Sequence, residues 1–102
     1  MAYRVEWLLE AVEVVESIAG FVSRDSQSYA SAWAHRILQA AEGLAQFPMK
    51  GRIVPEWNED SIRELIIGNY RLIYRVQQSD ILILAVIHGA RLLPESLIKR
   101  LG

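Results

Sequence analysis

The amino-acid sequence predicts an α+β fold in which a helical hairpin packs on one face of an antiparallel sheet. Two observations support this. Apolar residues recur every three or four positions over most of the first half of the chain, as in amphipathic helices. Over much of the second half they alternate with polar residues, as in strands. The length of 102 residues suits one domain, 1–102, with one core.

The first half predicts a short strand over 3–7 and a helix over 7–22, whose glutamates take the side opposite the apolar residues. Asp25 or Ser26 can cap a second helix, which Pro48 ends. The apolar stripes expected to face the core are Trp7, Leu8, Ala11, Val14, Val15, Ile18 and Phe21 or Val22 in the first helix, and Tyr29, Trp33, Ile37, Ala40, Leu44 and Phe47 in the second.

The second half predicts a loop and then three strands. Residues 48–61 hold two prolines, a glycine and mixed charge, which is typical of a loop. The strands are expected over 62–68, 70–77 and 81–90, and short turns between them predict an antiparallel meander. The last strand is apolar on both faces and should lie inside the sheet. A proline at the start and a glycine at the end predict a short helix over 94–102.

Composition excludes several kinds of site. The chain has no cysteine, and its two histidines, His35 and His88, lie far apart in the sequence, so no metal and no cofactor is expected. The longest apolar run, 81–87, is too short to cross a bilayer, and the N-terminus lacks the basic and then apolar regions of a signal peptide. We therefore expect a cytoplasmic protein with no membrane partner.

The charge is unevenly distributed. The net charge of −1 argues against a surface that binds nucleic acid as a whole. Residues 1–60 carry five basic and nine acidic residues, whereas 61–102 carry six basic and three acidic residues. This asymmetry indicates either an anionic target for the basic half or arginines on an ordinary solvated face.

The strand over 70–77 has two different faces. Tyr70, Leu72, Tyr74 and Val76 share one face and should be core residues, with the tyrosine hydroxyls at the sheet edge. Alternation puts Arg71, Ile73 and Arg75 on the other face. We expect that face to be an exposed, concave surface for an anionic target, with Ile73 as an apolar contact between the arginines.

Several segments together resemble the RelE/ParE superfamily of toxins from type II toxin–antitoxin modules. They are "IRELIIGNYRLIYRV", the turn and "ILILAVIHGARLLP" that follow, and the lead-in "FPMKGRIVPE". The resemblance covers nearly the whole chain and implies the element order β-α-α-β-β-β with a basic loop. It also implies a toxin that arrests growth and is neutralised by direct binding of a cognate antitoxin. Operator DNA would be contacted only indirectly, through that antitoxin.

The superfamily has two mechanisms on one scaffold, and the fold does not choose between them. RelE-like members are metal-independent endoribonucleases that cut mRNA on the ribosome. On that reading Arg71 holds the scissile phosphate, Arg91 is a second site arginine and His88 is a general acid. The alternatives are an Arg71 paired to a cross-strand acid and a structural His88, which alternation places with Leu82, Leu84 and Val86.

ParE-like members poison DNA gyrase, and the sequence favours this branch. The chain has only two lysines, its net charge is slightly acidic, and Glu64 stands in a stretch where RelE-like enzymes tend to place lysines. On this reading the basic residues and the isoleucine bind the antitoxin or the target: Lys50, Arg52, Arg63, Arg71, Ile73 and Arg75. A third reading is an inactive relative that only stabilises its antitoxin on operator DNA.

Overall fold

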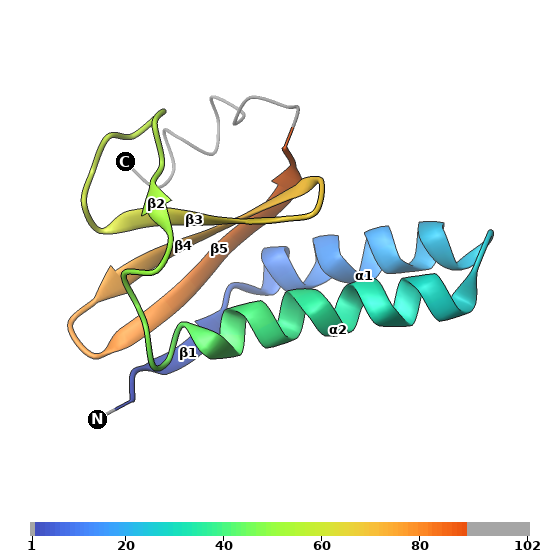
Figure 1. Ribbon diagram of the computed structural model, residues 1–102, viewed down its shortest axis with the longest axis horizontal. Helices are drawn as coiled ribbons and strands as arrows, with labels where there is room; N and C mark the ends of the chain where they lie inside the picture. Colours follow the sequence, from blue (N-terminus) through green and yellow to red (C-terminus); the bar gives the residue numbers. More distant parts are fainter. Residues whose placement is uncertain (1, 90–102) are drawn as a thin grey trace.

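The computed structural model describes residues 2–89, so Arg91 and the helix predicted over 94–102 lie outside the described residues. Within residues 2–89, two helices and five strands follow one another (Figure 1). In order they are β1 (Arg4–Trp7), α1 (Leu9–Ser23), α2 (Gln27–Gly43), β2 (Arg52–Ile53), β3 (Ile62–Ile67), β4 (Tyr70–Gln77) and β5 (Asp80–His88). The predicted α+β class and the order of its main elements are confirmed. Neither helix is long and apolar enough to span a membrane.

The sheet is mixed rather than antiparallel, which corrects the prediction. Its strand order is β1-β5-β4-β3-β2, and β1 pairs with β5 in parallel. The cause is the path of the chain. The helix α1 continues in the direction of β1, and α2 brings the chain back to the end of the sheet where β1 starts (Figure 1). From there β3 runs in the direction of β1. The two turns of the meander reverse the chain twice, so β5 also runs in that direction. As predicted, β5 lies inside the sheet.

The segment 48–61 is not entirely a loop, because it contains the short edge strand β2. This strand pairs antiparallel with β3, with Arg52 opposite Glu64. The approach is close: a Cβ atom on Gly51 would lie 2.5 Å from the Glu64 carbonyl oxygen and 2.7 Å from the Tyr74 hydroxyl. Only glycine fits here, and it lets the chain reach the sheet edge.

The main core lies between the helical hairpin and one face of the sheet (Figure 1). Its fully buried side chains include Ile37, Leu72, Tyr74 and Ile83. The predicted helix stripes are only partly correct: four of their members are exposed, namely Val14, Phe21, Tyr29 and Phe47, while Ala30 and Ala41 are buried. The α2 stripe is correct at Trp33, Ile37 and Leu44 and wrong at its ends, because the helix ends at Gly43, before Phe47, and because small alanines face inward.

A second, smaller core covers the opposite face of the sheet. It consists of Val54, Ile62, Ile73, Leu84 and Ala85, with Leu8, Trp57, Leu82 and Ile87 packed against it. Val54 and Trp57 belong to the segment between β2 and β3, which therefore lies over this face. The expectation that Ile73 is exposed is wrong: its side chain is fully buried. An apolar residue stands between two arginines because this part of their face is core.

A bulge between β4 and β5 changes which residues share a face. Ile73 pairs with Ala85 but Tyr74 pairs with Ile83, so Leu84 is the extra residue. Both Leu84 and Ala85 pack in the smaller core, whereas Val86 packs in the main core. The predicted grouping of His88 with Leu82 and Leu84 is therefore wrong, because simple alternation does not anticipate a bulge.

Candidate functional site

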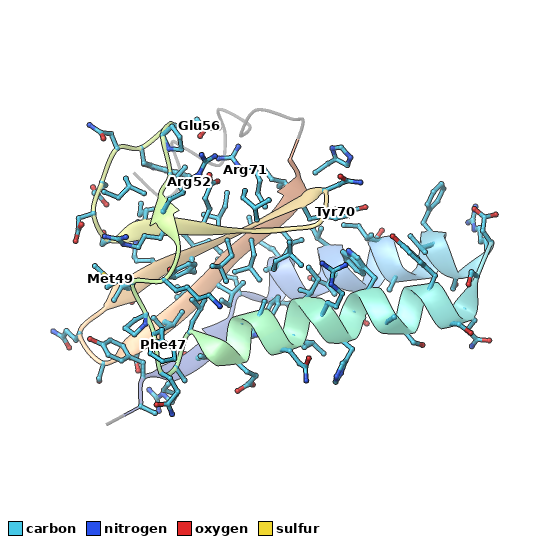
Figure 2. The ribbon with its side chains drawn as sticks, viewed as in Figure 1. Phe47, Met49, Arg52, Glu56, Tyr70 and Arg71 are labelled. Atoms are coloured by element: carbon cyan, nitrogen blue, oxygen red, sulfur yellow. The ribbon has the colours of Figure 1, made fainter. Side chains whose placement is uncertain are left out.

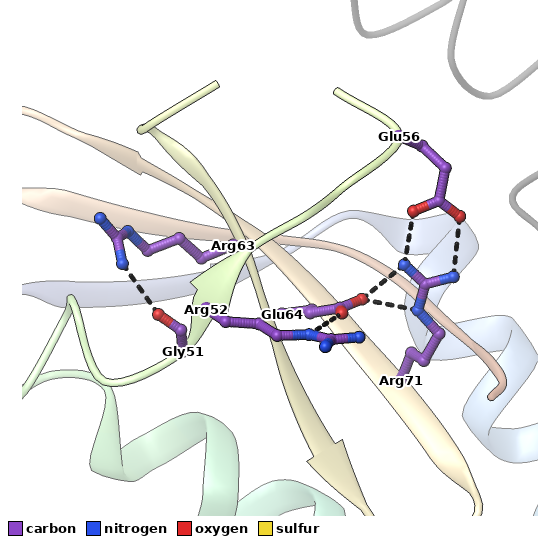
Figure 3. Close-up of polar contacts among 6 residues, drawn as sticks. All are labelled: Gly51, Arg52, Glu56, Arg63, Glu64 and Arg71. Atoms are coloured by element: carbon purple, nitrogen blue, oxygen red, sulfur yellow. Dashed lines mark hydrogen bonds and ion pairs between the residues drawn. The ribbon is translucent and has the colours of Figure 1, made fainter. Parts of the chain in front are cut away.

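The most distinctive polar feature is a buried arginine near one end of β4, the central strand of the sheet. Arg71, on β4, has only 6% of its surface exposed. Its Nε donates to Glu64 Oε1 on β3 at 2.6 Å, and its two terminal nitrogens, Nη1 and Nη2, donate to the two oxygens of Glu56 at 2.9 Å each (Figure 3). Arg71 thus uses two edges of its guanidinium for two carboxylates, the Glu56 pair being bidentate.

Glu64 connects this pair to a second arginine. Its other carboxylate oxygen, Oε2, accepts from Arg52 Nε on β2 (Figure 3). We call these four residues, Arg52, Glu56, Glu64 and Arg71, the ion-pair cluster. It contains two positive and two negative groups, and Glu64 is 1% exposed. Charges can be buried in this way because each has a partner of opposite sign.

Glu56 also has a clear electrostatic effect on Arg71. Its hydrogen bonds raise the pKa of Arg71 above the usual value, against the lowering effect of burial, and Glu64 adds to the rise. Arg71 is thus held as a cation by neighbours from two elements. The cluster joins β2, β3, β4 and the loop that covers the smaller core.

A cleft of about 630 Å³ opens beside the ion-pair cluster. Glu56 and Arg71 lie on its wall, and the exposed side chain of Ile66 adds an apolar surface. Among residues 2–89, its lining is Arg52, Pro55, Glu56, Ile66, Gly68, Asn69, Arg71, His88 and Gly89. The cleft lies at the end of the sheet where the turn from β3 to β4 meets the end of β5, and it presents both charged and apolar groups.

His88 lines this cleft together with Arg71 but is not a member of the ion-pair cluster. Its ring packs edge-on against Tyr70, with centroids 5.6 Å apart, and Tyr70 in turn contacts Trp33 of α2. The imidazole is therefore directed toward the face with the helices, whereas Arg71 is bonded to acids on the other face. Arg71 and His88 thus line the same cleft, while their described contacts lie on opposite faces of the sheet.

Three further predicted residues lie outside the ion-pair cluster. Arg63 donates to the carbonyl oxygens of Gly51 and Asp60 and to the Asp60 carboxylate, so it fastens both ends of the segment that contains β2. Arg75 is half-buried on β4, opposite Ile62. Lys50 is exposed beside Phe47 and Met49, which Figure 2 shows at a distance from Arg71.

Sequence reasoning missed both acids of the cluster. On the neighbouring strand, Arg71 pairs with Ile66, and Glu64 lies two residues before Ile66. Glu64 and Arg71 are therefore diagonal neighbours on the same face of the sheet. The alternation of β3 would have placed it on the arginine face, since Ile62 and Glu64 share that face. No comparable signal exists for Glu56, which lies in an irregular segment.

Among residues 2–89, no three acidic or histidine side chains are grouped so that they could hold a metal ion.

Comparison with known proteins identifies the family. Residues 5–93 match the model of the ParE toxin of the type II toxin–antitoxin system parDE. A curated relative from Sinorhizobium fredii, named "Putative toxin Y4kP", is 30% identical over 96 residues, which cover 92% of this chain and 96% of the relative.

Two solved structures share the fold. A chain of the chromosomal ParDE system from P. aeruginosa superposes with a TM-score of 0.70 at 19% identity, covering 85% of this chain and 96% of that one. A chain of the toxin–antitoxin complex RelBE2 from Mycobacterium tuberculosis gives 0.62 at 20% identity, covering 86% and 99%. Together with the family match over most of the sequence, they place the chain in the RelE/ParE superfamily. It belongs to the ParE family of toxins of type II toxin–antitoxin systems.

Proposed function

We propose that this ParE-family toxin arrests growth by inhibiting DNA gyrase through protein–protein contacts, and that a cognate antitoxin neutralises it by direct binding in the cytoplasm. The observation that carries the proposal is the state of Arg71. A ribonuclease of the RelE type needs this guanidinium to hold a phosphate, but both of its terminal nitrogens are bonded to Glu56. The arginine expected to do chemistry is thus engaged in holding the structure together.

The charge of the surface supports the same branch. Binding to ribosomal RNA requires many phosphate contacts, and affinity falls with each missing cation. This chain has a net charge of −1 and two lysines. Arg52, Arg63 and Arg71 are each bonded to acceptors within the protein. A protein target makes weaker demands on positive charge than a ribosome does.

The antitoxin is proposed as the direct partner by analogy with the two structural neighbours, which come from toxin–antitoxin systems. Arg52 and the cleft beside the ion-pair cluster, together with exposed Lys50, are proposed as part of the surface that meets the antitoxin or the target. Ile73 is excluded from that surface by its burial. Operator DNA is reached only through the antitoxin.

A supercoiling assay tests this function. Purified toxin is titrated against DNA gyrase and relaxed plasmid, and in parallel against ribosomes translating a labelled mRNA. We expect supercoiling to stop near stoichiometric toxin while the mRNA stays intact. Cleavage of the mRNA with unaffected supercoiling would contradict the proposal and favour the RelE-like enzyme. Growth that is unaffected by the toxin alone would favour the inactive relative.

A further inference from the structure

We propose that the outer edge of the Arg71 guanidinium is a binding site for a carboxylate side chain of a partner protein, and that Glu56 fills this site when the partner is absent. The site lies on the wall of the cleft described above, with Arg52, Arg71 and Glu56 grouped at one end of the sheet (Figure 2). The inference deepens the proposed function and rests on it in one respect: we take the partner to be the antitoxin.

The occupant of the site shows which chemistry it accepts. Glu56 receives two hydrogen bonds of 2.9 Å from Nη1 and Nη2, which is the paired geometry that arginine forms with a carboxylate (Figure 3). Glu64 Oε1 lies 2.6 Å from Nε and 2.6 Å from Nη2, so the two acids share Nη2, whereas Nη1 contacts Glu56. A second carboxylate that takes over the Nη1 and Nη2 contacts of Glu56 leaves the bond between Nε and Glu64 in place.

The two acids differ in how easily they can leave. The Glu64 side chain has no exposed surface, lies on a strand between β2 and β4, and accepts from two arginines. The Glu56 side chain is 20% exposed and follows Pro55 in the irregular segment between β2 and β3. Because Glu56 is held outside regular structure, it can move aside at a lower cost than Glu64.

Charge balance makes the binding competitive. With Glu56 in place the ion-pair cluster has no net charge, so an additional anion gains little by approaching it. Without Glu56 the cluster carries one excess positive charge, on an arginine that is largely buried. An incoming carboxylate is therefore attracted only as Glu56 departs, and the two should exclude each other.

The surroundings favour a protein carboxylate over the phosphate of a nucleic acid. Beside the site, Ile66 is 58% exposed, and Pro55 is also on the cleft wall. An acidic residue next to apolar residues in a peptide segment would satisfy both parts of this surface. A nucleic-acid backbone needs several cations in a row, and the described part of the cleft lining includes two basic side chains that are permanently charged, Arg52 and Arg71.

The test uses the whole chain, with sodium acetate as the probe and sodium chloride at the same ionic strength as the reference. The Arg71 Nε–Hε resonance, assigned by its loss in Arg71→Lys, is followed by NMR in the wild type, Glu56→Gln and Glu59→Gln. Glu59 is the matched control, because it is an exposed glutamate of the same segment that accepts from Ser61. Glu56→Ala is included because the side-chain amide in Glu56→Gln retains an oxygen that can accept hydrogen bonds from Arg71.

We expect a saturable response to acetate in the Glu56 variants and a much weaker one in the wild type and in Glu59→Gln. If Glu56 fills the site in about 90% of molecules, half-saturation should require about tenfold more acetate in the wild type. Equal responses in all proteins, or none in either folded Glu56 variant, would overturn the inference. Saturation by inorganic phosphate but not by acetate would overturn the carboxylate assignment and favour a nucleic-acid ligand.

Gyrase inhibition by the same preparations separates this inference from the proposed function. Wild-type toxin that blocks supercoiling, combined with Glu56 variants that ignore acetate, would leave the function standing and remove the carboxylate site. An acetate response with no effect on supercoiling would keep the site and contradict gyrase as the target.

Discussion

Arg71 and Glu64 form the innermost ion pair of the protein's sheet: the Arg71 Nε lies 2.6 Å from Glu64 Oε1, and the Glu64 side chain has no exposed surface. The two residues come from neighbouring strands, β4 and β3. They lie next to Ile73, which seals the smaller core. This relationship gives Arg71 a structural role.

Replacing Glu64 with alanine should destabilise the fold strongly. The change leaves two arginines, Arg52 and Arg71, without the carboxylate that joins them, and removing one partner of a buried pair costs about 3–5 kcal/mol. Chemical denaturation measures the free energy of unfolding. The control is Glu59→Ala, since exposed substitutions usually change stability by less than about 0.5 kcal/mol. Equal stability of the two variants would show that the ion-pair cluster contributes little.

Replacing Gly51 with alanine should also be destabilising, for steric reasons. The new Cβ would meet the Glu64 carbonyl oxygen at 2.5 Å, so β2 must shift away from β3. Gly20→Ala is the matched control, because Gly20 lies inside α1 with nothing near its Cβ position. Alanine there should stabilise the helix by up to about 1 kcal/mol. Thermal unfolding should therefore move in opposite directions in the two variants, and a shared direction would contradict the packing described here.

The Tyr74 hydroxyl should contribute to stability through the loop that it holds. It accepts from the Gly51 N–H at 2.9 Å and donates to the Pro48 carbonyl oxygen at 2.8 Å. Tyr74→Phe leaves these buried backbone groups unpaired, which should cost about 1–3 kcal/mol. Tyr29→Phe, at an exposed tyrosine, controls for the loss of a hydroxyl in general. If both variants unfold like the wild type, the hydroxyl does not fasten the loop.

Tyr74 also predicts how stability depends on alkaline pH. Burial raises the pKa of Tyr74 above its ordinary value of 10.0. As pH rises past about 10, the unfolded chain loses the phenol proton before the folded chain does, so stability falls with rising pH. The stability difference between wild type and Tyr74→Phe should therefore be constant below about pH 9 and shrink at higher pH. Urea unfolding of both proteins from pH 8 to 11 measures it, and a constant difference across this range would argue against a buried phenol.

The sequence predicted the positions of the helices and strands better than it predicted how the strands pair and which side chains are covered. Hydrophobic periodicity located the two helices and the three strands of the meander because local patterns determine them. It did not reveal that β1 runs parallel to β5, since pairing direction depends on the path of the chain in space. Nor did it reveal the cover over Ile73, because Val54 and Trp57 come from a segment without periodicity.

In the candidate site too, local patterns were informative and long-range contacts were not. For Arg71, the alternative of a cross-strand acid was correct in part, because Glu64 on the adjacent strand binds it. The predicted exposure of Arg71 was wrong, since Glu56 and the segment around it reach over from outside the meander. Long-range contacts of this kind leave no periodic signal in one sequence.

The most direct test of the account is a pulse-labelling experiment after induction of the toxin alone. Incorporation of labelled thymidine is compared with incorporation of labelled amino acid during the first minutes. The account predicts that DNA synthesis falls first, because gyrase is the target and Arg71 is committed to the ion-pair cluster. If protein synthesis falls first, the toxin acts on translation, which would contradict gyrase as the target.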